Sequence, residues 1–148
     1  MPVITTKRLN FPPVRIRDTD LTLLRVLDAA AFADDEPYED IESDICWIAK
    51  VDGIPAGFAC LNIMDDKEGF LSRCGVMPKF RGLGIQKKLI ETRIKYASLI
   101  ELQSLVTYTS EDNTYSQNNL KVCGFNIVVP EQLFGLENGI YFHRSIGE

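Results

Sequence analysis

The sequence has little of what several common enzyme classes require. It contains a single histidine, His143, in a strand-like Tyr-Phe-His-Arg run, and no Gly-x-Ser-x-Gly elbow. A hydrolase built on a nucleophile and a histidine base is therefore set aside. The four cysteines lie far apart in the sequence and form no C-x-x-C pair, so we expect reduced thiols in apolar surroundings, with neither disulfides nor a metal site.

Long apolar runs are also missing. The first residues lack the apolar core of a signal peptide, and no run is long enough to span a membrane, so we expect a cytoplasmic protein with no membrane partner. The net charge of −5 argues against a nucleic-acid partner. With 148 residues, 45% hydrophobic content and no linker or repeat, the chain is expected to form one domain over residues 1–148.

The hydrophobic pattern predicts an alternation of strands and helices. Strands are expected at residues 14–17, 46–50, 57–62, 70–76 and 104–109, and two more follow residue 124; Asp52-Gly53 predicts a hairpin turn between the second and third. Helical spacing appears in residues 21–31, about 83–100 and 113–124, the last opened by Asn113 as N-cap and closed by Gly124. If the helix at 83–100 is a right-handed crossover, the strands before and after it are parallel. This order predicts an α/β domain with a mixed sheet.

The segment from Val76 to Leu89 is the most informative stretch of the chain. A strand pattern ends at Val76, Pro78 stops it, and Gly82 and Gly84 precede a helix that begins near Ile85. Such a turn leaves backbone N–H groups unpaired at the positive end of a helix, and the glycines allow a ligand to approach the main chain. Four cations crowd the same residues and favour a diphosphate: Lys79, Arg81, Lys87 and Lys88.

Spacing narrows the choice of phosphate ligand. No Walker loop is present, and Lys87 stands where a dinucleotide fingerprint needs its third glycine. Val-x-Pro-x-x-Arg-Gly-x-Gly-Ile instead resembles the acyl-coenzyme A signature of the GNAT superfamily of N-acetyltransferases, although Gln86 departs from it at the last position. The resemblance implies a mostly antiparallel sheet of six to seven strands with a central parallel pair, about four flanking helices, and acetyl-CoA as cofactor. It places the cofactor against Cys74, Val76, Arg81, Gly82, Leu83, Gly84, Ile85, Gln86 and Lys87.

Residues 113–125 resemble a second GNAT signature, in which Asn113, Ser116, Gly124 and Phe125 match. The resemblance implies that Asn113 and Ser116 contact the cofactor, while Leu120 occupies the position of the tyrosine that commonly protonates the leaving thiolate. Ser116 and Tyr115 are the candidate replacements for that acid, with Tyr108 and Tyr141 as further hydroxyls. Each of them is also a reasonable structural residue.

The reaction implied is direct attack of a primary amine on a bound acyl thioester. A lysine-like amine with a pKa near ~10.4 is neutral in only about one molecule in 2,500 at pH 7, so a carboxylate should assist. Many family members carry that carboxylate four residues before the valine of the fourth strand, where this chain has Ser72. Glu36, Asp65 and Glu68 are alternatives, each of them also an ordinary solvated charge.

Residues 34–44 contain seven acids and no base, in the region where the family shapes its acceptor site. They would attract a cationic acceptor such as a lysine side chain, a polyamine or an aminoglycoside, or they form a solvated loop. Glu36, Tyr38 and Ser72 are the candidate acceptor-site residues. Two other functions are compatible with the sequence: an acyl-CoA-binding module without catalytic activity and, with less support, a nucleotide-binding regulator. A homodimer is considered only because dimers are the commonest assembly.

Overall fold

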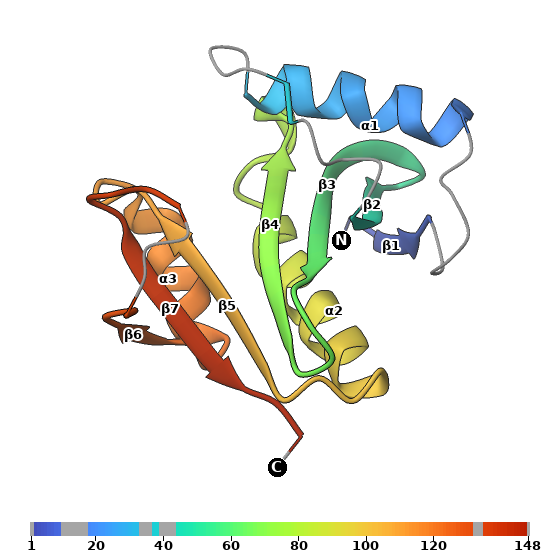
Figure 1. The fold of residues 1–148 in the computed structure, drawn as a ribbon. Helices are drawn as coiled ribbons and strands as arrows, with labels where there is room; N and C mark the ends of the chain where they lie inside the picture. Colours follow the sequence, from blue (N-terminus) through green and yellow to red (C-terminus); the bar gives the residue numbers. More distant parts are fainter. Residues whose placement is uncertain (1, 10–17, 33–36, 39–43, 132–134, 148) are drawn as a thin grey trace. The chain divides into compact units, whose positions relative to one another are not determined.

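The computed structural model describes residues 2–9, 18–32, 37–38, 44–131 and 135–147 (Figure 1). Its strands are β1 (Ile4–Arg8), β2 (Ile45–Val51), β3 (Ile54–Ile63), β4 (Glu68–Val76), β5 (Ser104–Thr109), β6 (Asn126–Val128) and β7 (Ile140–Ser145). Its helices are α1 (Asp18–Ala31), α2 (Ile85–Leu99), α3 (Thr114–Val122) and the short 3-10 helix η2 (Pro78–Phe80). None of the described helices is long and apolar enough to cross a membrane.

The strands form one seven-stranded sheet in the order β1-β2-β3-β4-β5-β7-β6. β4 pairs with β5 in parallel, whereas β2 with its two neighbours and β7 with its two neighbours are antiparallel. The mixed, mostly antiparallel sheet and the parallel pair joined through α2 confirm the predicted fold class. By compactness the chain divides into a first unit, Met1–Asn62 with Ser72–Leu89, and a second unit, Ile63–Leu71 with Ile90–Glu148.

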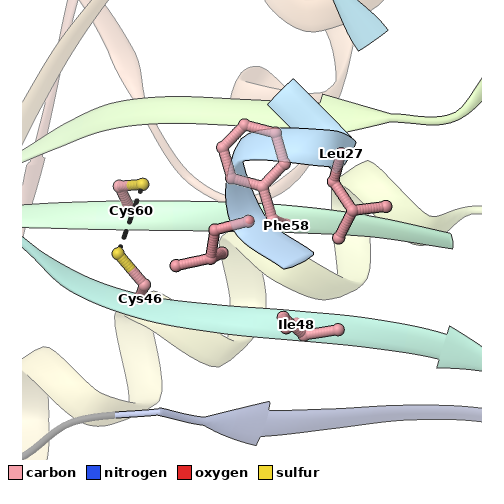
Figure 2. Packing of buried hydrophobic residues seen from close by; sticks show 6 residues of the cluster. Leu27, Cys46, Ile48, Phe58 and Cys60 are labelled. Atoms are coloured by element: carbon pink, nitrogen blue, oxygen red, sulfur yellow. Dashed lines mark hydrogen bonds between the residues drawn. The ribbon is translucent and has the colours of Figure 1, made fainter. Parts of the chain in front are cut away.

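The core of the first unit lies between α1 and strands β2 and β3. Figure 2 shows Leu27 of α1 together with Ile48 of β2 and Phe58 of β3, all 3% exposed or less. Cys46 of β2 and Cys60 of β3 are paired across the hairpin, and their sulfur atoms lie 3.6 Å apart. Two of the four cysteines predicted to be reduced are therefore neighbours in this core.

The hairpin between β2 and β3 follows from its turn residues. Asp52 and Gly53 both have positive φ, 50° and 82°, which is the conformation that a two-residue hairpin turn requires and that Asp-Gly favours. Asp52 also accepts a hydrogen bond from the backbone N–H of Val3 at 2.9 Å. The turn thereby helps to hold β1 beside β2.

In the second unit, β5 pairs with the first residues of β4 and with β7. Aromatic rings extend along these strands: the ring centroid of Tyr108 lies 5.7 Å from that of Phe70 and 5.5 Å from that of Tyr141. Leu105 and Phe142 are fully buried. The β5 strand begins and ends at the residues that the sequence predicts, because its apolar run is bounded by polar residues on both sides.

The N-terminal strand differs from expectation. The strand predicted at residues 14–17 lies outside the described residues, and the first described strand is Ile4–Arg8, where the sequence predicts none. Ile4–Arg8 is short and carries two charged and two hydroxyl side chains, so its alternation of half-buried and exposed residues gives a weak sequence signal. Pairing with the strongly apolar β2 is what makes it a strand.

Candidate functional site

The glycine turn of the first unit connects the end of β4 to the start of α2. Gly82 and Gly84 have φ of +83° and +79°, and a Cβ atom added to either glycine would meet no atom within 4 Å. Lys88 N donates to Gly84 O at 3.1 Å, so the N–H groups of the preceding turn have no partner inside the helix. The turn therefore presents main-chain donors beside open space.

Cationic side chains surround this turn. Arg81 is exposed and its Nε donates to Val76 O at 3.3 Å, and Lys79 Nζ lies 5.1 Å from the Phe80 ring centroid. Lys87 and Lys88 are exposed in the first turn of α2. A diphosphate fits this set of groups, because backbone N–H groups, a helix N-terminus and exposed cations all favour concentrated negative charge.

The predicted cofactor residues differ in whether their side chains are accessible to a ligand. Leu83 is exposed and Gln86 half-buried, but Ile85 is 1% exposed and its Cγ2 faces Gly57. Only the main chain of Ile85 is therefore available to a ligand. Cys74 and Val76 are half-buried on β4, two residues apart and hence on one side of the strand.

A buried polar network lies in the same unit. The Asp44 side chain, 1% exposed, accepts hydrogen bonds from Tyr38 OH at 2.6 Å, from Asn62 Nδ2 at 3.0 Å and from Ser72 Oγ. Burial raises the pKa of the Tyr38 phenol, the hydrogen bond to the Asp44 carboxylate raises it further, and the Ser72 hydroxyl opposes them. The structure thus joins two predicted acceptor-site residues, Tyr38 and Ser72, through a carboxylate.

A second carboxylate holds the other side of Tyr38. Asp28 of α1 accepts from Tyr38 N at 3.1 Å and from Arg73 Nε at 3.0 Å. The Arg73 guanidinium lies 3.9 Å from the centroid of the Phe32 ring, which is a cation–π contact. Tyr38 is therefore fixed through its backbone as well as its hydroxyl. Glu36, the remaining predicted acceptor-site residue, lies outside the described residues.

In the second unit, Asn113 caps α3: its Oδ1 accepts from Ser116 N at 3.1 Å. Ser116 is half-buried and Tyr115 is 56% exposed. Leu120, at the expected position of the tyrosine acid, is 4% exposed and belongs to the apolar interior of this unit. The hydroxyl of Tyr141 donates to Leu136 O at 2.7 Å, so this hydroxyl is engaged in a hydrogen bond within the fold.

The alternative carboxylates are engaged in local structure. Asp65 Oδ1 accepts from Lys67 N and Glu68 N, both at 2.8 Å, and these two backbone hydrogen bonds lower its pKa. Glu68 accepts from Ser104 Oγ at 2.8 Å, a bond between β4 and β5. Asp44 was not singled out from the sequence, where it reads as the last acid of a charged loop. Among the described residues there is no group of His, Cys, Asp or Glu suited to holding a metal ion.

Comparison with known proteins gives consistent results. The model of the acetyltransferase (GNAT) family matches residues 16–125. The aminoglycoside N(6')-acetyltransferase type 1 of Salmonella typhimurium is 30% identical over 106 residues, which cover 66% of this chain and 73% of that protein.

Solved structures share the fold at lower identity. The ribosomal-protein-S18-alanine N-acetyltransferase of Escherichia coli superposes with a TM-score of 0.76 at 18% identity, covering 99% of this chain and 96% of that one. A GNAT family acetyltransferase of Elizabethkingia anophelis with acetyl-CoA bound has a TM-score of 0.69 at 18% identity, with 97% and 98% covered. The PaiA N-acetyltransferase of Thermoplasma acidophilum in complex with coenzyme A has a TM-score of 0.71 at 16% identity, with 97% and 99% covered.

Proposed function

The chain belongs to the acetyltransferase (GNAT) family, and from this premise we propose that it transfers the acetyl group of acetyl-CoA to a primary amine. The observation that carries the proposal is the glycine turn between β4 and α2. Its two positive-φ glycines, its open side and its exposed cations support the proposal that it binds a diphosphate. Relatives of the same fold are described with acetyl-CoA or coenzyme A bound, which supports the choice of ligand.

In this proposal the turn holds the diphosphate and the β4 residues Cys74 and Val76 line the pantetheine arm. Acetyl-CoA brings the activated acyl group as a thioester. The protein has to hold both reactants, donate hydrogen bonds to the developing oxyanion and help to deprotonate the amine. The thiolate leaves readily because thiols ionise near pH ~8.5, so the buried Leu120 does not preclude turnover.

We propose a cationic amine as the acceptor. Residues 34–44 are strongly acidic in sequence, and a positively charged acceptor would be attracted to them. The Salmonella relative is named for acetylating aminoglycosides, which carry several ammonium groups. Kanamycin, spermidine and a lysine derivative blocked at its α-amine are therefore the first acceptors to assay.

The test is the release of free thiol from acetyl-CoA when each of these amines is added. We expect turnover that requires the amine and is abolished in Gly84→Glu, because the new side chain fills the open space beside the main-chain donors and repels phosphate. Gly53→Glu is the matched control: Gly53 also has positive φ, +82°, and open space around it, but it lies in the β2–β3 hairpin. Both variants should carry similar backbone strain, and only Gly84→Glu should lose activity.

The buried Leu120 favours one alternative, an acyl-CoA-binding module without activity. Tight binding of coenzyme A that depends on Gly84, together with no thiol release across the amine panel, would establish the module and exclude the enzyme. Amine-dependent release would exclude the module.

A further inference from the structure

The buried carboxylate of Asp44 has a role beyond holding the fold together. Three side chains from different parts of the first unit donate to it: Tyr38 before β2, Asn62 of β3 and Ser72 of β4. Tyr38 and Ser72 share one carboxylate oxygen, Oδ2, while Asn62 occupies Oδ1. The network is therefore organised around a single oxygen that two hydroxyl groups reach.

Exposure orders this network from outside to inside. Ser72 and Tyr38 are both half-buried, whereas Asp44 is 1% exposed. Ser72, a partly exposed residue, is thus bonded to an enclosed carboxylate. Ser72 also lies on β4, the strand that carries Cys74 and Val76 and leads into the glycine turn. Ser72, Cys74 and Val76 alternate along β4 and therefore share one side of the strand.

We propose that Asp44 takes up the proton of the acceptor ammonium through the hydroxyl of Ser72, and so makes the acceptor a nucleophile at neutral pH. This inference rests on the proposed function. Ser72 would touch the acceptor, and Asp44, which acts through Ser72, is a positioning residue. Without such a route, an amine with a pKa near ~10.4 is almost entirely protonated at pH 7, and only its small neutral fraction can attack.

The proton balance is simple. One N–H bond of the ammonium breaks as its proton moves to Ser72 Oγ, and the original Ser72 proton moves to Asp44 Oδ2, which becomes a carboxylic acid. The neutral amine then uses its lone pair to form the C–N bond at the acetyl carbon, and the C–S bond breaks with its electron pair on sulfur. The amide nitrogen loses its extra proton to solvent or to the thiolate, and Asp44 returns its proton to solvent through Ser72.

Ser72 suits this transfer better than Tyr38. Tyr38 is fixed at its backbone N–H by Asp28, and burial together with the Asp44 carboxylate keeps its phenol protonated. Tyr38 therefore serves to hold Asp44 Oδ2 in place. Among the residues that the structure describes, the titratable and charged groups next to the network are Asp28 of α1, Cys46 of β2, Cys60 of β3 and Arg73 of β4.

The experiment measures kcat against pH for the unaltered chain, Asp44→Asn and Ser72→Ala, with the panel amine that the unaltered chain acetylates fastest. We expect the kcat of the unaltered chain to change little between pH 7 and pH 9. Both variants should be slower at pH 7 by about 10²-fold, and their kcat should rise about tenfold per pH unit because only amine deprotonated in solution reacts. The gap between variant and unaltered chain therefore closes as pH rises.

Controls separate this effect from a loss of structure. Thr107→Val removes another buried hydrogen bond, from Thr107 Oγ1 to Leu71 O, and should keep the flat profile whatever stability it loses. Coenzyme A binding measured by calorimetry should change less than about threefold in Asp44→Asn, because the cofactor turn is untouched. If Asp44→Asn does not fold, Ser72→Ala decides the matter, since it leaves Asp44 with its other two donors.

Folded variants with a flat profile and kcat within about threefold of the unaltered chain would overturn the role of Asp44 while leaving acetyl transfer intact. Absence of turnover in the unaltered chain with every amine would instead refute the proposed function, and this inference with it.

Discussion

At the scale of single residues, Tyr38 shows how a half-buried group can be more constrained than its exposure suggests. Its backbone N–H donates to Asp28 and its hydroxyl to Asp44, so two carboxylates from different parts of the chain fix it. A phenol that donates to a carboxylate loses this bond when it ionises and gains a repulsion in its place. Its protonated form is therefore favoured in the folded state.

This leads to a prediction about alkaline pH. Because the pKa of Tyr38 is raised in the folded protein, the unfolded chain releases this proton first, near pH ~10. Stability should therefore be fully present below that pH and fall as pH rises above it. Between pH 8 and pH 11, the free energy of unfolding measured in urea should fall less for Tyr38→Phe than for the unaltered chain. The other four tyrosines are present in both proteins, so their ionisation affects both equally. An equal fall in the two proteins would show that Tyr38 ionises normally.

A second residue-scale prediction concerns Gly57 of β3. A Cβ atom there would lie 2.7 Å from Gly75 O, a backbone atom that cannot rotate away. Gly57→Ala should therefore lower the free energy of unfolding by about 1–3 kcal/mol, the usual range for overpacking. Denaturant melts test this directly. Unchanged stability would mean that β3 and β4 can separate slightly at no cost.

At the scale of elements, α3 depends on its cap. Asn113 Oδ1 accepts from Ser116 N, which satisfies one of the donors that the start of the helix leaves open. Asn113→Ala should cost about 1 kcal/mol, whereas Asn118→Ala, an exposed change inside the same helix, should be neutral or slightly stabilising. Equal effects of the two substitutions in thermal melts would argue against capping as the role of Asn113.

Elements were predictable from the sequence where local chemistry decides them. Asp52-Gly53 specifies its hairpin, Asn113 and Gly124 bracket α3, and the apolar run of β5 is bounded by polar residues. The strand Ile4–Arg8 was not predicted, because its pairing with β2 rather than its own composition makes it a strand. Local signals cannot report a partner that lies some forty residues away in the chain.

The Asp44 network was unpredictable for the same reason. Tyr38 and Asp44 precede β2, Asn62 lies in β3 and Ser72 in β4, so the network joins three separate stretches, and Ser72 and Asp44 are 28 residues apart. In the sequence Asp44 ends an acidic run that resembles a solvated loop, but the fold turns it inward beneath two hydroxyl groups. By contrast, the glycine turn is contiguous from Val76 to Lys88, so spacing alone predicted the turn and the helix behind it, and the structure adds that both glycines have positive φ.

At the scale of the whole molecule, a net charge of −5 has to be reconciled with a ligand that carries phosphate groups. The distribution of charge resolves this. Seven acids lie in residues 34–44, so the remainder of the chain sums to +2 (−5 plus 7), and cations gather at the glycine turn. Negative charge is therefore concentrated where a cationic acceptor is proposed to bind, and positive charge where a diphosphate is proposed to bind.

The most direct test of this account is calorimetric titration of the protein with coenzyme A and, separately, with pantetheine, which has the same arm but no diphosphate. If the glycine turn binds the diphosphate, coenzyme A should bind with a stoichiometry of one to one, and pantetheine should bind at least about 10²-fold more weakly. The affinity for coenzyme A should also fall as salt is added. Equal affinities for the two compounds, or no heat with coenzyme A, would contradict the account.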